Sequence, residues 1–146
     1  MTTTPFVHLH VHSDYSAMRG VSSLETLCRL AKRQGLGALA VTDTNGLYGA
    51  IRFIEEARHE GLRPILGAEL TTESRRALLW VKTPGGYANL CRLLSERHCE
   101  PSFSFIEAVA RYRDGLIIAT DDQAALEAWS SDDPQDLYVE LTPGPA

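Results

Sequence analysis

Segments with a helical spacing of apolar residues alternate along this chain with short, continuous apolar runs. Apolar residues recur at positions i, i+3, i+4 and i+7 from Leu24 to Ala31 and again from Ala50 to Ala57, which predicts two amphipathic helices. Apolar runs without polar alternation are typical of strands that are covered on both faces. Such a run lies at residues 38–42, and further strands are expected at residues 63–70, 77–82, 115–120 and 137–141.

Together with a β-branched start at residues 6–12, these patterns predict six strands and five helices. Ser22 with Glu25, and Ser104 with Glu107, have the spacing of a capping box at a helix start. Gly35 predicts a helix end. Residues 71–75 read as a hairpin connection, and 84–86 as a turn before a helix. The last three helices are expected at residues 87–94, 104–112 and 121–130.

Strands that alternate with helices indicate an α/β fold with crossover connections and a largely parallel sheet. We expect one domain over residues 1–146. The elements are too few for an eightfold barrel, which takes about 250 residues. An incomplete barrel would leave exposed edges on its outer strands, so self-association or further chain would have to cover them.

Composition narrows the class of protein. The chain has 14 Lys and Arg against 19 Asp and Glu, a net charge of -5, which argues against a free-standing nucleic-acid binder. It does not exclude a domain whose neighbours hold the nucleic acid. The three cysteines form no CxxC pair and are expected to be reduced. Neither a signal peptide nor an apolar stretch of about 20 residues is evident, so we expect a cytoplasmic protein without membrane contact.

The densest group of polar residues is the segment from His8 to Asp14. On a strand, residues i and i+2 point to one face, so His10 and His12 can bind one ion together. Imidazole is a favoured ligand of zinc, and a carboxylate such as Glu69 can bridge two ions. The alternative is a set of hydrogen-bonded histidines without a metal.

Position in the fold strengthens the metal hypothesis. Residues 42–46 follow the second expected strand, and residues 67–69 end the third. Active sites of α/β folds lie at the carboxyl ends of strands, and three aligned polar loops are typical of a site. Asp43 by itself is equally typical of a turn or a helix cap.

The segments FVHLHVHSDYSAMRG, ALAVTDTNGLYGAIRF and GLRPILGAEL resemble the opening motifs of the PHP (polymerase and histidinol phosphatase) domain. They are similar in particular to its version at the N-terminus of the bacterial DNA polymerase III alpha subunit. The segments GYANLCRLLSERH, DGLIIAT and LYVEL resemble later parts of the domain in that family, especially in its error-prone paralogue.

The resemblance implies a partial (β/α)7 TIM-like barrel with a metal cluster at the strand ends. It implies phosphoester hydrolysis in active members, in some polymerases as a metal-dependent 3′–5′ exonuclease. By motif position His10 and His12 match ligands, and Glu69 matches the bridging carboxylate. Asp43 matches a supporting residue, and we place His8 and Asp14 beside it in that role.

Two positions depart from the family pattern. Thr44 stands where the family has a histidine, and Arg19 stands where it has an aspartate before the glycine. Both missing groups serve the same metal position in the resemblance, and a fixed positive charge would repel a dication there. We therefore expect at most one divalent ion per chain, Zn²⁺, Mn²⁺ or Mg²⁺.

Three hypotheses remain open. The first is a partly degenerate PHP module of a polymerase III alpha-type or error-prone polymerase, chiefly structural or weakly hydrolytic, which meets DNA through neighbouring domains. The second is a stand-alone metal-dependent phosphoesterase of the histidinol-phosphatase kind. The third is a structural fragment without metal. No residue set here resembles a polymerase palm site, so nucleotidyl transfer would need the rest of a longer chain, and we expect this chain to be truncated.

Overall fold

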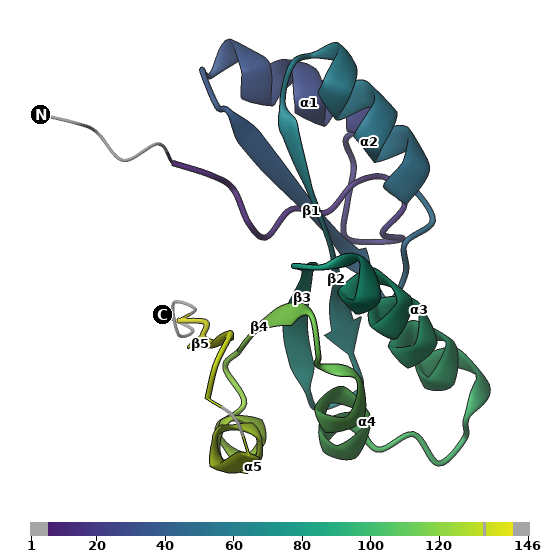
Figure 1. The fold of residues 1–146 in the computed structure, drawn as a ribbon. Helices are drawn as coiled ribbons and strands as arrows, with labels where there is room; N and C mark the ends of the chain where they lie inside the picture. The colour runs from purple at the N-terminus through teal and green to yellow at the C-terminus, as the bar shows by residue number, and fades with distance from the viewer. Residues whose placement is uncertain (1–5, 133, 142–146) are drawn as a thin grey trace, which may run out of the picture. The chain divides into compact units, whose positions relative to one another are not determined.

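The computed structural model describes residues 6–132 and 134–141, which form five helices and five strands (Figure 1). The helices are α1 (Leu24–Arg33), α2 (Ala50–His59), α3 (Pro84–Cys99), α4 (Phe105–Tyr112) and α5 (Gln123–Asp132). The strands are β1 (Ala38–Thr44), β2 (Arg63–Thr71), β3 (Arg76–Val81), β4 (Leu116–Thr120) and β5 (Leu137–Val139). The α/β class predicted from the sequence is confirmed.

The sheet is mixed, with the strands hydrogen-bonded in the order β1–β2–β3–β4–β5. Strand β3 is antiparallel to β4, and β4 is parallel to β5. The sheet predicted as largely parallel with one hairpin is therefore mixed, with an antiparallel pairing of β3 and β4 that was not predicted. The reason is connectivity: two helices separate β3 from β4, so the chain returns in the opposite direction, whereas the single helix α5 leads to a parallel neighbour.

The segment 6–12, predicted as a strand, is not one. It still lies along β1, where Ala40 donates a backbone hydrogen bond to the His8 carbonyl (3.0 Å) and Thr42 donates one to the Val11 carbonyl (2.8 Å). Three residues of the segment therefore stand opposite two residues of β1. This extra residue is a bulge-like interruption that breaks the regular ladder.

The chain divides inside β2 into two compact units, Met1–Ala68 and Glu69–Ala146. In the first unit, helices α1 and α2 lie side by side (Figure 1) and bury their apolar stripes with β1. The core residues are Leu24, Cys28, Ala31, Leu39, Val41, Phe53, Ala57 and Leu62. The two helical stripes predicted from the sequence are confirmed.

The helix caps differ in detail from those predicted. Helix α1 is capped by Ser23, whose side chain accepts a hydrogen bond from the Thr26 backbone, and not by Ser22. The helix start is therefore shifted by one residue, and the predicted capping box of Ser22 with Glu25 is not formed. Gly35 lies just beyond this helix with a φ of 75°, a left-handed conformation that suits glycine, as predicted.

In the second unit, Thr72 donates a backbone hydrogen bond to the Arg75 carbonyl (2.8 Å), which closes the predicted tight turn between β2 and β3. Residues 84–86, predicted as a turn, are the first turn of α3, with Thr83 as the cap. Proline suits this position because the first helical residue needs no N–H partner. Ser104 stands at the N-cap position of α4, as predicted, but its side chain makes no capping hydrogen bond.

Helices α3, α4 and α5 cover the apolar positions of the second unit. Trp129 is fully buried against Phe105, with ring centroids 5.8 Å apart, and its indole N–H donates to the Ile106 carbonyl (3.0 Å).

None of the helices in the described part of the chain has the length and apolar content needed to cross a bilayer.

Candidate metal centre

The segment that carries the histidines is held to β1 by the Thr42 side chain as well as by the backbone. The Thr42 hydroxyl accepts a hydrogen bond from the Val11 N–H (3.1 Å) and lies 3.3 Å from the Val11 carbonyl, to which it also donates. Val11 itself packs against the core of the first unit. His10 and His12, on either side of Val11, are thereby directed away from that core.

Asp43 anchors the next part of the segment. Its carboxylate is buried and accepts three hydrogen bonds, from the Ser13 N–H (2.7 Å), the Ser13 hydroxyl (2.7 Å) and the Ser16 hydroxyl (2.6 Å). Ser16 in turn accepts a hydrogen bond from the Thr44 backbone (2.9 Å). A carboxylate that accepts this many hydrogen bonds is satisfied by the protein. Both oxygens of the Asp43 carboxylate are thus engaged by serine donors.

Gly20 closes this loop by close approach of two backbones. Its N–H donates to the Ser16 carbonyl (2.9 Å), and a Cβ atom at position 20 would overlap the carbonyl of Ser13. Only glycine leaves room for that carbonyl, so the loop from Ser13 to Gly20 depends on this position.

Glu69 lies on β2 directly after the last residue of the first unit, and its side chain is 1% exposed. A buried carboxylate needs a charged or hydrogen-bonding partner. One partner is Arg76 on β3, whose Nη1 lies 3.8 Å from Glu69 Oε1.

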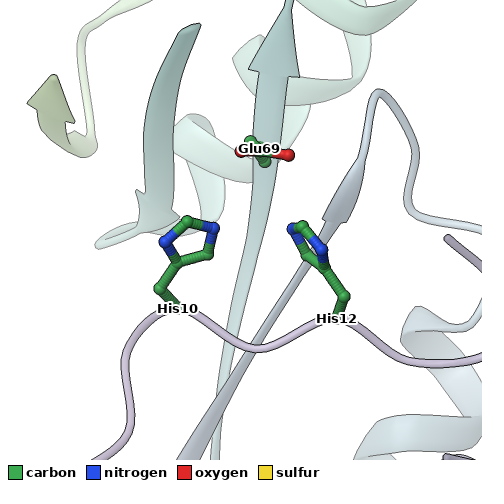
Figure 2. A group of neighbouring side chains, drawn as sticks. All are labelled: His10, His12 and Glu69. Carbon is green, nitrogen blue, oxygen red and sulfur yellow. The ribbon is translucent and has the colours of Figure 1, made fainter. Parts of the chain in front are cut away.

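His10, His12 and Glu69 each offer a ligand atom, and these three atoms all lie within 4.8 Å of one another. Figure 2 shows both imidazole rings turned toward Glu69. The two rings are 5.2 Å apart between centroids and inclined by 71°. The grouping of these three residues, expected as ligands from the sequence, is thus present in the geometry.

The chemistry of the three donors fits one divalent ion. Two imidazoles and one carboxylate, with a fourth position open, are a known type of zinc donor set. In a tetrahedral site with bonds of about 2.0–2.1 Å, ligand atoms lie about 3.3 Å apart, so small side-chain rotations would suffice. Nε2 of His12 and Oε1 of Glu69 are buried atoms that make no hydrogen bond within the described residues, although both residues have other interactions.

Residues 8–132 match the family of the PHP domain. The chain belongs to the PHP domain family. The match covers most of the chain and includes both histidines of the candidate metal centre as well as Glu69, so the resemblance drawn from the sequence is confirmed.

The relatives of this PHP domain are polymerases. It is 49% identical over 94 residues to an error-prone DNA polymerase of Symbiobacterium thermophilum, a match that covers 64% of this chain and 9% of the relative. It is 37% identical over 136 residues to the DNA polymerase III subunit alpha of Treponema pallidum, which covers 80% of this chain and 12% of the relative. The chain spans about a tenth of the length of the curated relatives it matches.

A solved structure shares the fold of this PHP domain. A protein of Bifidobacterium adolescentis described as a metal-dependent phosphoesterase superposes with a TM-score of 0.65 at 16% identity. The match covers 92% of this chain and 76% of that protein. At this identity the likeness concerns the fold alone.

Other residues singled out in the sequence lie outside the three-residue group. His8 is exposed and packs edge-on against Phe6, with ring centroids 4.8 Å apart. Asp14 and Arg19 are exposed in the loop that Asp43 anchors. Thr44 ends β1 with its backbone N–H bonded to Ser16.

Three residues that support the centre of this PHP domain were not predicted from the sequence. Ser13 and Ser16 hold Asp43, and Arg76 pairs with Glu69. The spacing of the two serines just after the histidines was a usable signal, because hydroxyls near a buried carboxylate commonly donate to it. Arg76 gave no comparable signal, because its partner lies on a different strand.

Proposed function

We propose that this chain is the PHP domain of a polymerase of the DNA polymerase III alpha or error-prone kind. In this proposal it acts in the cytoplasm, as part of a longer chain whose other domains hold the DNA. Both compact units belong to one PHP-type domain with the topology of a partial (β/α)7 barrel. The family match and the identities of 37–49% to long polymerases support this assignment.

The observation that carries the proposal is the convergence of His10, His12 and Glu69 within 4.8 Å. We propose that these residues hold a single divalent ion, Zn²⁺, Mn²⁺ or Mg²⁺. A divalent ion bound there would act as a Lewis acid toward a phosphoryl oxygen. The protein's own contribution is to direct the two imidazoles with the Thr42 and Asp43 hydrogen bonds and to keep Glu69 buried beside Arg76.

The chain's hydrolytic role is proposed to be weak or lost. Two-metal hydrolysis needs ions about 4 Å apart and more ligands than three. Asp43, the carboxylate next to the histidine segment, has both oxygens engaged by serine donors. Thr44 offers no imidazole, and Arg19 brings positive charge to the same loop. The domain is therefore chiefly a structural part of its polymerase.

Metal content provides the first test. Purified chain is loaded with Zn²⁺, Mn²⁺ or Mg²⁺ in turn, dialysed, and analysed for bound metal per chain. We expect at most one ion in the wild type and close to none in His10→Ala, His12→Ala and Glu69→Gln. His59→Ala is the matched control, because His59 is an exposed histidine on α2 that pairs with Glu60, and it should retain the wild-type metal content.

Hydrolysis provides the second test. Release of phosphate from p-nitrophenyl phosphate and of nucleotides from a primed DNA 3′ end is measured with each metal. We expect little or no turnover in the wild type, and we expect His10→Ala to show the same background rate. Two or more ions per chain together with His10-dependent cleavage would favour an active phosphoesterase over this proposal, and a wild type without any metal would favour a purely structural fragment.

A further inference from the structure

Arg76, the first residue of β3, is shared by three carboxylates of the second unit. Its Nη1 lies 3.8 Å from Glu69 Oε1 on β2. Its Nη2 donates to Asp121 Oδ2 (3.0 Å) and to Glu140 Oε2 (2.8 Å), which come directly after β4 and β5. A single guanidinium thus contacts one acidic group on β2 and two that directly follow β4 and β5.

The sheet fixes this arrangement. The antiparallel register that pairs Leu78 with Ala119 continues to place Arg76 opposite Asp121. The Thr120 hydroxyl donates to the Arg76 carbonyl (2.6 Å), and the Glu140 N–H donates to the Thr120 carbonyl (3.0 Å). These hydrogen bonds fix the backbone of Arg76 beside the ends of β4 and β5, and a guanidinium that turned away would lose its bonds to Asp121 and Glu140.

The formal net charge of this cluster is negative enough to balance one dication. Glu69, Asp121 and Glu140 carry three negative charges, and Arg76 offsets one of them. An arginine guanidinium stays protonated in proteins. The guanidinium is therefore a permanent positive charge beside Glu69, whose side chain is 1% exposed.

We propose that Arg76 determines how tightly the centre binds metal and how many ions it accepts. The guanidinium lies beside Glu69 Oε1, where its charge repels both the ion held with His10 and His12 and any second cation that Glu69 would attract. This inference rests on the proposed function of the metal centre. At separations of a few ångström in a partly screened site, removing a unit charge changes the affinity for a dication by about tenfold or more.

Calorimetric titration of the full chain with Zn²⁺ and with Mn²⁺ tests the proposal. Arg76→Met should bind at least about tenfold more tightly than the wild type, and Arg76→Lys, which keeps the charge, should stay within about threefold. Arg75→Met is the matched control: Arg75 is the preceding residue and pairs with Asp122 (2.6 Å) instead. It should also stay within about threefold.

A second variant keeps the arginine and should change the metal affinity in the opposite direction. Glu140→Gln leaves more of the Arg76 charge uncompensated, so metal affinity should fall several-fold. Unchanged or weaker binding by Arg76→Met, or equal gains in Arg76→Met and Arg75→Met, would overturn the inference. So would tighter binding by Glu140→Gln.

A measurement without metal separates this inference from the proposed function. In EDTA, Glu69→Gln should lower the Tm of the wild type, because Arg76 loses a partner. In the Arg76→Met background the same change should raise the Tm, because it removes an uncompensated buried charge. A decrease in both backgrounds would refute the role of Arg76, whereas a wild type that binds no metal would refute only the proposed metal centre.

Discussion

Replacing Asp43 should show how strongly the histidine segment depends on one buried carboxylate. Asp43→Ala leaves three donors without their acceptor, the Ser13 N–H, the Ser13 hydroxyl and the Ser16 hydroxyl. A hydrogen bond to a charged group contributes roughly 1.5–3 kcal/mol, but the three share one acceptor and water can reach part of the loop. We expect a loss of about 3–4 kcal/mol in the free energy of unfolding.

Asp43→Asn should cost less than Asp43→Ala. The amide keeps one acceptor oxygen for the two donors that now share Oδ1, and its NH2 group can donate to the Ser13 hydroxyl. A loss of about 1–2 kcal/mol is expected, because only the charge-assisted part of the network disappears. Asp14→Ala is the control: Asp14 is an exposed carboxylate in the same loop, and its loss should change the unfolding free energy by less than about 0.5 kcal/mol.

Urea denaturation in EDTA measures these differences without a contribution from bound metal, and unchanged m-values would show that the same surface unfolds. The order expected is Asp43→Ala, then Asp43→Asn, then Asp14→Ala. If Asp43→Ala cost less than about 1 kcal/mol, or no more than Asp14→Ala, the carboxylate would not anchor the histidine segment.

The remaining predictions concern Gly20 and Cys28. Gly20→Ala should destabilise the fold by more than about 2 kcal/mol in the same urea assay, because the added carbon overlaps the Ser13 carbonyl, whereas Gly37→Ala, which meets open space, should cost under about 0.5 kcal/mol. Burial, helped by the charges of Glu56 and Glu60, raises the pKa of the Cys28 thiol from 9.0 to about 11. Since the unfolded thiol loses its proton at lower pH, this stabilisation is complete below about pH 9 and is lost as the pH rises toward 11, a fall of about 3 kcal/mol that Cys28→Ala should abolish in pH-dependent melts. At pH 8 iodoacetamide should modify the exposed Cys99 well before Cys28, and equal rates would contradict the burial argument.

Local patterns predicted the elements whose structure is decided locally. The stripes of α1 and α2 and the apolar runs of β1 to β4 form and bury most of their apolar residues, and the run of β5 also forms although Tyr138 and Val139 are exposed. The start of α1 was misplaced by one residue because Ser22 and Ser23 are both good caps, and only packing decides between them. Pattern alone therefore located the elements but not their exact ends.

The candidate site was predictable in its ligands and less so in its surroundings. The pair of histidines and Glu69 stood at expected strand ends, and the geometry brings them together. The pairing of Asp43 with two serines and of Arg76 with Glu69 joins residues that are far apart in sequence or lie on different strands. Such partners depend on strand register, which a single sequence without an alignment does not specify.

The additional residue between His8 and Val11 matters for anyone who would transfer this centre to another scaffold. On an evenly pleated strand, alternate side chains share a face by geometry alone, and two histidines could be grafted by copying their spacing. Here the segment has an extra residue before Val11, so the position of the two histidines along β1 depends on an irregular path that is hydrogen-bonded to Ala40 and Thr42. A transplanted centre would have to keep this irregular path and its hydrogen bonds to β1. Deleting Leu9 to make the pairing regular should separate the two imidazole rings.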